Sequence, residues 1–288
     1  MNAFRKQLFY ISVLAAQLVF IQPTFAQNQT ESQTQKQIQS LHWVGAPTTA
    51  EVTPRATIKL KGDTKYLGEA DTKKFLKLNG NPERDGHYTI ASPSEGWFAI
   101  FSFLPEGYVK DDEKIDADAL LSSLKESNKV SIEERKKEGI PVLYLDGWYV
   151  PPHYDSITKR LEWGVKFHDE QGNPVINYTS RILGRNGYMN AILVSEPTTL
   201  DRDVKSYKTA LQNFDYNVGE NYSEFRQGDK IAEYGLGALV LGGAAAVAAK
   251  KGFFTVIAAF FAMAWKWILG AGLLAMTRFK SIFGKKDK

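Results

Sequence analysis

Residues 151–155 place three side chains that can do acid–base chemistry on a stiff stretch of backbone. Pro151 and Pro152 limit the backbone just before His153, Tyr154 and Asp155. An imidazole titrates near neutral pH, so His153 is a natural proton donor or acceptor. The segment therefore predicts a binding or acid–base loop. The alternative is a capped turn in which His153 and Asp155 satisfy backbone groups.

Two arginines near the end of a predicted strand add positive charge. Arg181 and Arg185 can together clamp an anionic ligand, or each can form an ion pair with one of the many acids of the same region. We expect residues 177–185 to fold back toward the diproline segment. The candidate binding residues are therefore His153, Tyr154, Asp155, Arg181 and Arg185.

Metal chemistry has weaker support. The acids Asp111, Asp112 and Asp116 crowd the start of a predicted helix and form a weak candidate for a divalent cation. They lack the spacing of an EF-hand, and the alternative is a group of solvated acids at a helix start. The four histidines are scattered singly and there is no cysteine, which excludes zinc ribbons, iron–sulfur clusters and disulfides. No cofactor is predicted.

The distribution of charge indicates a membrane rather than a nucleic acid as partner. Residues 27–233 carry 26 basic and 31 acidic side chains, a net charge of −5, whereas residues 250–288 carry eight basic side chains and one acid. A nucleic-acid-binding domain needs basic residues clustered on a folded face. Here the basic excess lies beside apolar segments, which is typical of membrane topology signals.

The N-terminal residues predict export. Residues 1–26 have the basic start, apolar stretch and small-residue end of a secretory signal peptide; an uncleaved anchor is the alternative. Residues 27–41 are rich in Gln, Ser and Thr and predict a flexible polar leader.

Near the C-terminus, residues 252–277 are apolar enough for a transmembrane helix, although Lys266 lies within them. The basic tail at 278–288 places the C-terminus in the cytoplasm. We therefore expect a single-pass protein of the bacterial inner membrane with its main domain in the periplasm and the lipid bilayer as a partner. Residues 231–251 form a Gly/Ala-rich juxtamembrane segment, either a small-residue helix at the surface or half of a hairpin.

Between these ends, residues 42–230 predict one α+β domain, with an antiparallel meander and packed helices. The apolar run at 97–104 predicts a central strand buried on both faces, because it has no polar alternation. Asn186-Gly187 predicts a hairpin. The other expected strands are 57–61, 142–149, 160–168, 175–183 and 188–194, and the expected helices are 71–78, 115–137 and 200–212.

Several short motifs resemble a family of uncharacterised, membrane-anchored bacterial proteins, the domain of unknown function 2167. They occur in order from about residue 41 onward, at 107–112 (GYVKDD), 115–121 (IDADALL), 147–148 (GW), 152–155 (PHYD), 177–181 (NYTSR), 183–185 (LGR) and 232–236 (AEYGL). The resemblance implies a signal peptide, a periplasmic domain and a C-terminal anchor. It brings no activity and no catalytic residues.

Two classes of function follow. The chain has no nucleophile elbow, P-loop, HExxH motif or dinucleotide-binding glycine pattern. This favours a non-enzymatic envelope protein that binds a partner protein. The alternative is an envelope hydrolase or transferase that uses His153 and Asp155 with Glu134 or Arg181, and it requires these side chains to converge in one pocket.

Overall fold

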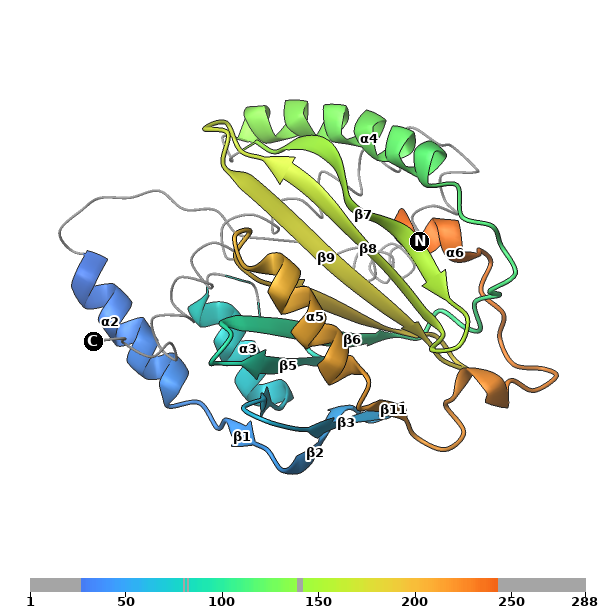
Figure 1. Cartoon of the computed structure of the whole chain (residues 1–288), viewed down its shortest axis with the longest axis horizontal. Coiled ribbons are helices and arrows are strands. Elements are labelled where there is room, and N and C mark those ends of the chain that lie inside the picture. The colour runs from blue at the N-terminus through green and yellow to red at the C-terminus, as the bar shows by residue number, and fades with distance from the viewer. Residues whose placement is uncertain (1–26, 80, 82, 139–141, 243–288) are drawn as a thin grey trace, which may run out of the picture.

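An eight-stranded antiparallel sheet forms the centre of the molecule (Figure 1). The computed structural model describes residues 27–79, 81, 83–138 and 142–242. In spatial order, the strands of the large sheet are β1 (Val44–Gly45), β4 (Lys65–Leu67), β5 (His87–Ser92), β6 (Trp97–Leu104), β10 (Tyr188–Val194), β9 (Pro174–Leu183), β8 (Arg160–His168) and β7 (Tyr144–Asp155). A small sheet is formed by β11 (Phe214–Tyr216), β3 (Ala56–Leu60) and β2 (Thr48–Thr53). The predicted α+β class with an antiparallel meander is confirmed, since β7, β8, β9 and β10 are neighbours in chain order.

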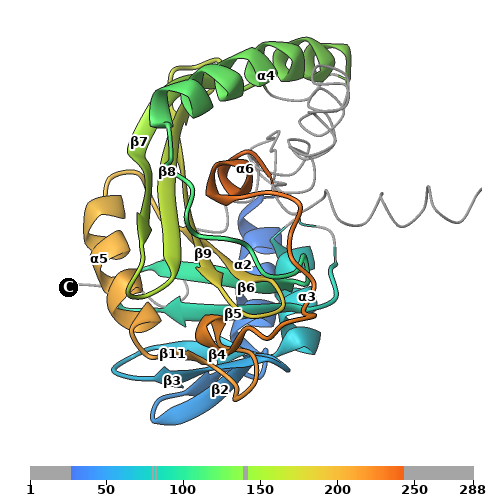
Figure 2. The same ribbon diagram turned by 90° about the vertical axis from the view of Figure 1, so that its right-hand side faces the viewer.

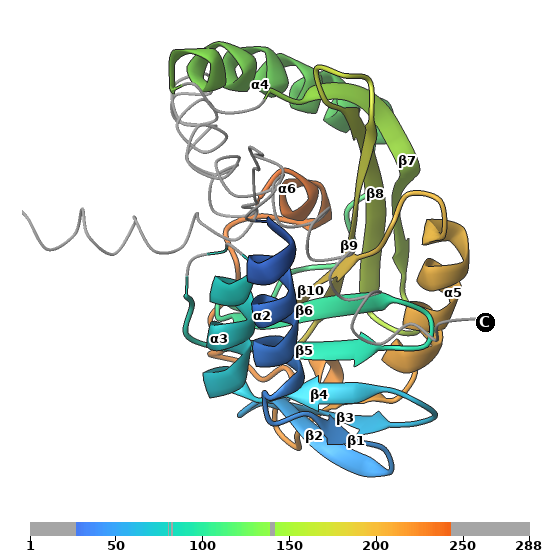
Figure 3. The same ribbon diagram turned by 90° about the vertical axis from the view of Figure 1, so that its left-hand side faces the viewer.

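Helices cover both faces of the large sheet. They are α2 (Gln27–Gln39), α3 (Glu69–Leu78), α4 (Ala117–Glu138), α5 (Leu200–Leu211) and α6 (Leu236–Val240), with a short 3₁₀ turn η1 (Tyr222–Glu224). Figure 2 shows α5 on one side of β7 and β8, with α6 on the other side. Figure 3 shows α2 and α3 side by side on the face of β5 and β6 away from α5. The fold is therefore a layered sandwich.

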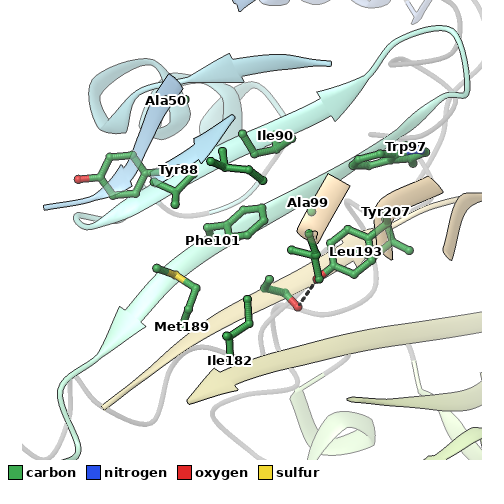
Figure 4. Packing of buried hydrophobic residues seen from close by; sticks show 14 of the residues in the cluster. Ala50, Tyr88, Ile90, Trp97, Ala99, Phe101, Ile182, Met189, Leu193 and Tyr207 are labelled. Carbon is green, nitrogen blue, oxygen red and sulfur yellow. Dashed lines mark hydrogen bonds between the residues drawn. The ribbon is translucent and has the colours of Figure 1, made fainter. Parts of the chain in front are cut away.

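The strand β6 is central, as predicted. It pairs with β5 on one side and β10 on the other. Its side chains alternate between two cores, because Trp97, Ala99 and Phe101 pack with α5 and the small sheet while Phe98 packs with α3. Figure 4 shows the first of these cores, in which Trp97 lies beside Tyr207 of α5.

The polar segment at residues 27–41 is not the flexible leader that its composition predicts. It forms helix α2, and Ile38 near its end is almost completely buried, at 1% exposure. Ile38 packs with Leu67, Phe75 and Phe98, while the indole nitrogen of Trp43 donates to the Ile38 carbonyl oxygen at 2.9 Å. A few apolar contacts at one end of the helix thus offset a poor local composition.

The predicted signal peptide at 1–26, the membrane segment at 252–277 and the tail at 278–288 lie outside the described residues. Within the described part of the chain, no helix is both long and apolar enough to cross a membrane. Of the juxtamembrane segment, the structure describes residues 231–242, which include α6.

Candidate functional site

The diproline segment is part of a strand rather than a turn. Strand β7 runs through Pro151 and Pro152 to Asp155, and its pairing with β8 shifts between Val150 and His153. The predicted strand end at residue 149 is therefore wrong. Proline lacks a backbone donor, and an edge strand such as β7 accepts it at a bulge without losing a ladder hydrogen bond.

His153 binds a neighbouring carboxylate across the strands. It lies opposite Glu162 of β8, and its Nε2 is 3.3 Å from Glu162 Oε2. The imidazole is half exposed, and its Nδ1 lies 3.4 Å from the Pro151 carbonyl oxygen. The hydrogen bond to Glu162 raises the pKa of His153 against the opposing effect of partial burial.

Glu162 is the centre of a buried charge cluster that the sequence does not reveal. Its side chain is only 4% exposed, and Lys208 of α5 places Nζ 2.7 Å from Oε2 while Arg160 Nε lies 3.2 Å from Oε1. The hydroxyl of Ser180 donates to Oε1 at 3.0 Å. Burial opposes ionisation, but the hydrogen bonds from His153 and Lys208 and the charge of Arg160 dominate and lower the pKa of Glu162 to about 2.

Tyr154 and Asp155 have structural partners elsewhere. The hydroxyl of Tyr154 donates to Asp111 Oδ2 at 2.7 Å, and Lys159 Nζ binds the same oxygen at 2.8 Å. Asp155 accepts from the backbone N–H of Ile157 at 2.9 Å and from the Thr158 hydroxyl at 2.7 Å. Asp155 thus caps the turn at 156–159 that joins β7 to β8, whereas the capped-turn alternative placed the turn at the prolines.

The two arginines are also bound to the protein itself. Arg181 Nη1 donates to the carbonyl oxygen of Leu239 in α6 at 2.5 Å, and its guanidinium lies 4.9 Å and 5.3 Å from the ring centres of Tyr188 and Trp163. Arg185 makes a two-pronged ion pair with Asp229, with both distances at 2.7 Å. Arg185 therefore fulfils the ion-pair alternative.

His153 and Arg181 do not share a site. Ser180 of β9 contacts Glu162 on the α5 side of the sheet, together with His153. The next residue, Arg181, contacts α6 on the other side. Successive side chains of a strand point to opposite faces. The structure therefore separates the residues that the sequence analysis combined into one site.

Two of the three acids near the start of α4, Asp111 and Asp116, have partners within the fold. Asp111 binds Tyr154 and Lys159, which lower its pKa despite partial burial. Asp116 accepts from the backbone N–H of Ala119 at 2.9 Å and so caps the helix, while Asp112 is exposed. Among the described residues, no group of three or more potential ligand side chains is placed to hold a metal ion.

A cleft of about 510 Å³ lies where α5 meets β3 of the small sheet, and none of the residues proposed from sequence lines it. Its apolar walls come from Ile58, Leu60, Ile90 and Ala210. Its charged lining is mostly basic, with Lys59, Lys61, Arg202 and Lys205 against Glu95. The volume is in the range of small-ligand sites.

The sequence gives no signal for the cleft. Its lining comes from residues 58–64, 90–95 and 202–213, which are far apart in the chain. Only the packing of α5 beside the small sheet brings them together. The burial of Glu162 is not predictable from the sequence either. Glu162 occupies a polar position in the alternating pattern of β8, which predicts a solvent-exposed side chain, but in the structure Lys208 covers it.

Comparison with known proteins gives a family but no activity. No curated protein matches the chain. Among solved structures, the solution structure of cyanobacterial PsbP (CyanoP) from Synechocystis sp. PCC 6803 is similar over 60% of this chain and 95% of that chain, at 9% identity and a TM-score of 0.34. The family model described as "Protein of unknown function (DUF2167)" matches residues 45–274. This match covers well over half of the sequence, so the chain belongs to the DUF2167 family.

Proposed function

We propose that this protein is a membrane-tethered binding module of the bacterial cell envelope and not an enzyme. In this proposal, residues 252–277 anchor the chain in the inner membrane, the α+β domain is periplasmic and the C-terminus is cytoplasmic. The export pattern at 1–26 and the basic tail at 278–288 support this topology.

The separation of His153 from Arg181 is the observation that carries the binding role. A hydrolase or transferase needs a base, its orienting group and a charge-stabilising group around one reacting atom. Here His153 is tied to Glu162, Asp155 caps a turn and Arg181 is fixed to α6 on the opposite face. These polar groups already have partners within the fold, which favours stable architecture over acid–base catalysis.

Reporter fusions test the topology. A reporter that requires export, fused after residue 242, is expected to be active, and a cytoplasmic reporter fused after Lys288 is expected to be active as well. Cytoplasmic behaviour of both fusions would refute the proposed topology.

In-cell cross-linking of the full chain, followed by affinity capture, tests the binding role. We expect an envelope protein to be recovered, and a chain lacking residues 252–277 is the matched control for the role of the anchor. His153→Ala is expected to capture the partner and rescue a deletion phenotype as well as wild type. A folded His153→Ala variant without phenotype rescue would instead support the hydrolase or transferase alternative.

A further inference from the structure

We infer that the cleft between α5 and β3 binds an amphipathic anion, a ligand with an apolar body and a phosphate or carboxylate group. The inference rests on the proposed binding role and adds a site and a ligand class to it. The cleft is separate from every residue that the sequence analysis selected.

The walls of the cleft suit an apolar body. Ile58, Leu60 and Ile90 belong to the main hydrophobic core, and Ala210 of α5 packs against that core. Each of these residues also lines the cleft, and since Ile58 and Ile90 are 1% exposed and Leu60 4%, they form an apolar floor of which a ligand contacts a small part. Ligand pockets usually combine such apolar walls with a few polar groups that fix orientation.

The charge of the lining selects an anion. Four basic side chains and one acidic side chain line the cleft. Asp203 binds Arg202, and Asp215 lies 4.0 Å from Lys59, which leaves Lys61 and Lys205 as the lining cations without a carboxylate partner among the described residues. Residues 27–233 as a whole have a net charge of −5. Two lysines without carboxylate partners at one cleft of an acidic domain attract anions to this position in particular.

Lys61 is available to bind a ligand, because the neighbouring acid, Asp63, is hydrogen-bonded to other groups. Asp63 accepts from the Ser92 hydroxyl at 2.9 Å and from the Ser94 backbone N–H at 2.7 Å. These hydrogen bonds lower the pKa of Asp63 although partial burial opposes ionisation. Within the part of the chain that the structure describes, Lys61 has no ion pair with a carboxylate.

Lys205 is available for a similar reason. The acid one turn before it on α5, Asp201, accepts a hydrogen bond from Tyr149. Asp203 is fully buried and binds Arg202, Ser195 and Thr199. Lys205 therefore has no carboxylate partner among the described residues, and its exposed ammonium group can meet a ligand.

Other polar groups of the cleft are held in place. Arg202 is fixed by Asp203 and by the carbonyl oxygen of Glu95, at 2.6 Å. The indole nitrogen of the buried Trp97 donates to Glu95 Oε2 at 2.9 Å and to the Ser206 hydroxyl at 3.1 Å. A lining that is already ordered loses little conformational freedom when a ligand binds.

This inference is tested by titrating small probe molecules into the full chain, held in nanodiscs whose lipids have no net charge. The probes are naphthyl phosphate and naphthoate, with inorganic phosphate and naphthol as probes that carry only the charge or only the apolar ring. The test variant is Lys61→Glu/Lys205→Glu. The matched control is Lys125→Glu/Lys166→Glu, whose exposed lysines do not line the cleft. Calorimetry measures affinity, and circular dichroism checks folding.

We expect wild type to bind naphthyl phosphate or naphthoate more tightly than phosphate or naphthol. The test variant should bind roughly tenfold more weakly, and the control variant should match wild type. Binding by wild type should also weaken as salt is raised. The ratio of the affinities for naphthyl phosphate and naphthoate identifies the preferred anionic group.

Equal binding of the anionic probes by wild type and the test variant would overturn the inference, as would naphthol binding as tightly as naphthyl phosphate. If the test variant does not fold, Lys61→Gln/Lys205→Gln replaces it, with the same criteria and a smaller expected loss. Partner capture and reporter activity by wild type do not depend on these probes. The cleft inference can therefore fail while the proposed function holds.

Discussion

Glu162 and Arg181 are charged residues on the two opposite faces of the same meander, and the fold stabilises their charges differently. Glu162 is surrounded by side chains: His153, Arg160, Lys208 and the hydroxyl of Ser180. Arg181 has no carboxylate partner among the described residues, and it binds the Leu239 carbonyl oxygen, the Asn190 side chain and two aromatic rings. The α5 face thus depends on titratable groups, whereas the α6 face depends on a cation that stays charged at every ordinary pH.

The largest expected effect is the removal of the buried carboxylate. Glu162→Ala leaves the surrounding cations unpaired, and breaking a buried ion pair costs about 3–5 kcal/mol. Urea unfolding of a chain that ends at Gly242 measures this loss. Glu162→Gln is the control, since its amide oxygen still accepts from Ser180, and it should lose less. A loss below about 1 kcal/mol for Glu162→Ala would contradict the central role of this cluster.

Acid should weaken the α5 face selectively. The pKa of Glu162 is lowered from 4.5 to about 2, so its stabilisation is present above pH 4.5 and is lost as pH falls toward 2. The shift corresponds to about 3 kcal/mol. The unfolding free energy of wild type should therefore fall more steeply over this range than that of Glu162→Gln. If the unfolding free energies of the two proteins changed in parallel with pH, the α5 face would not depend on the ionisation of Glu162.

The next effect, on the other face, is the loss of the contact that holds α6. Arg181→Ala removes a charged hydrogen bond to Leu239 and two ring contacts, and we expect a loss of about 2–3 kcal/mol. Hydrogen exchange of the α6 amides should speed up in Arg181→Ala and remain slow in Glu162→Gln. Equal exchange in both variants would show that Arg181 does not hold α6.

The smallest expected effect is at the half-exposed member of the Glu162 cluster. His153→Ala should cost less than about 1 kcal/mol, because solvent screens its ion pair. Its pKa is raised, so the stabilisation is present below pH 6.5 and is lost as pH rises through the folded-state value. The unfolding free energies of wild type and His153→Ala should therefore converge at alkaline pH. In a Glu162→Gln background, His153→Ala should have no further effect.

The sequence predicts most of the strands and helices of the domain. The expected strands at 97–104, 160–168 and 188–194 agree with β6, β8 and β10 at both ends. The helices at 71–78 and 200–212 agree with α3 and α5 to within two residues. Apolar periodicity and turn residues are local signals, and these elements carry them strongly.

Local signals failed where tertiary contacts decide the outcome. Diprolines predict a break, yet β7 continues through them because it is an edge strand with a bulge. The polar residues 27–39 form a helix because Ile38 packs against the apolar side chains of α3 and its neighbouring strands. Strand β5 was not predicted, although all six of its residues are buried.

The sequence shows which charged residues the chain contains, but it does not show which of them come together around Glu162 or around Arg181. Alternation in a strand determines that Ser180 and Arg181 face opposite ways, while only the pairing register and the packing of α5 and α6 decide which partners each meets. The same holds for Lys61 and Lys205, which are 144 positions apart in the chain and share a cleft because α5 lies beside the small sheet. Composition and periodicity act over a few residues, whereas a site depends on contacts between distant segments, which exist only after the sheet and its helices have packed.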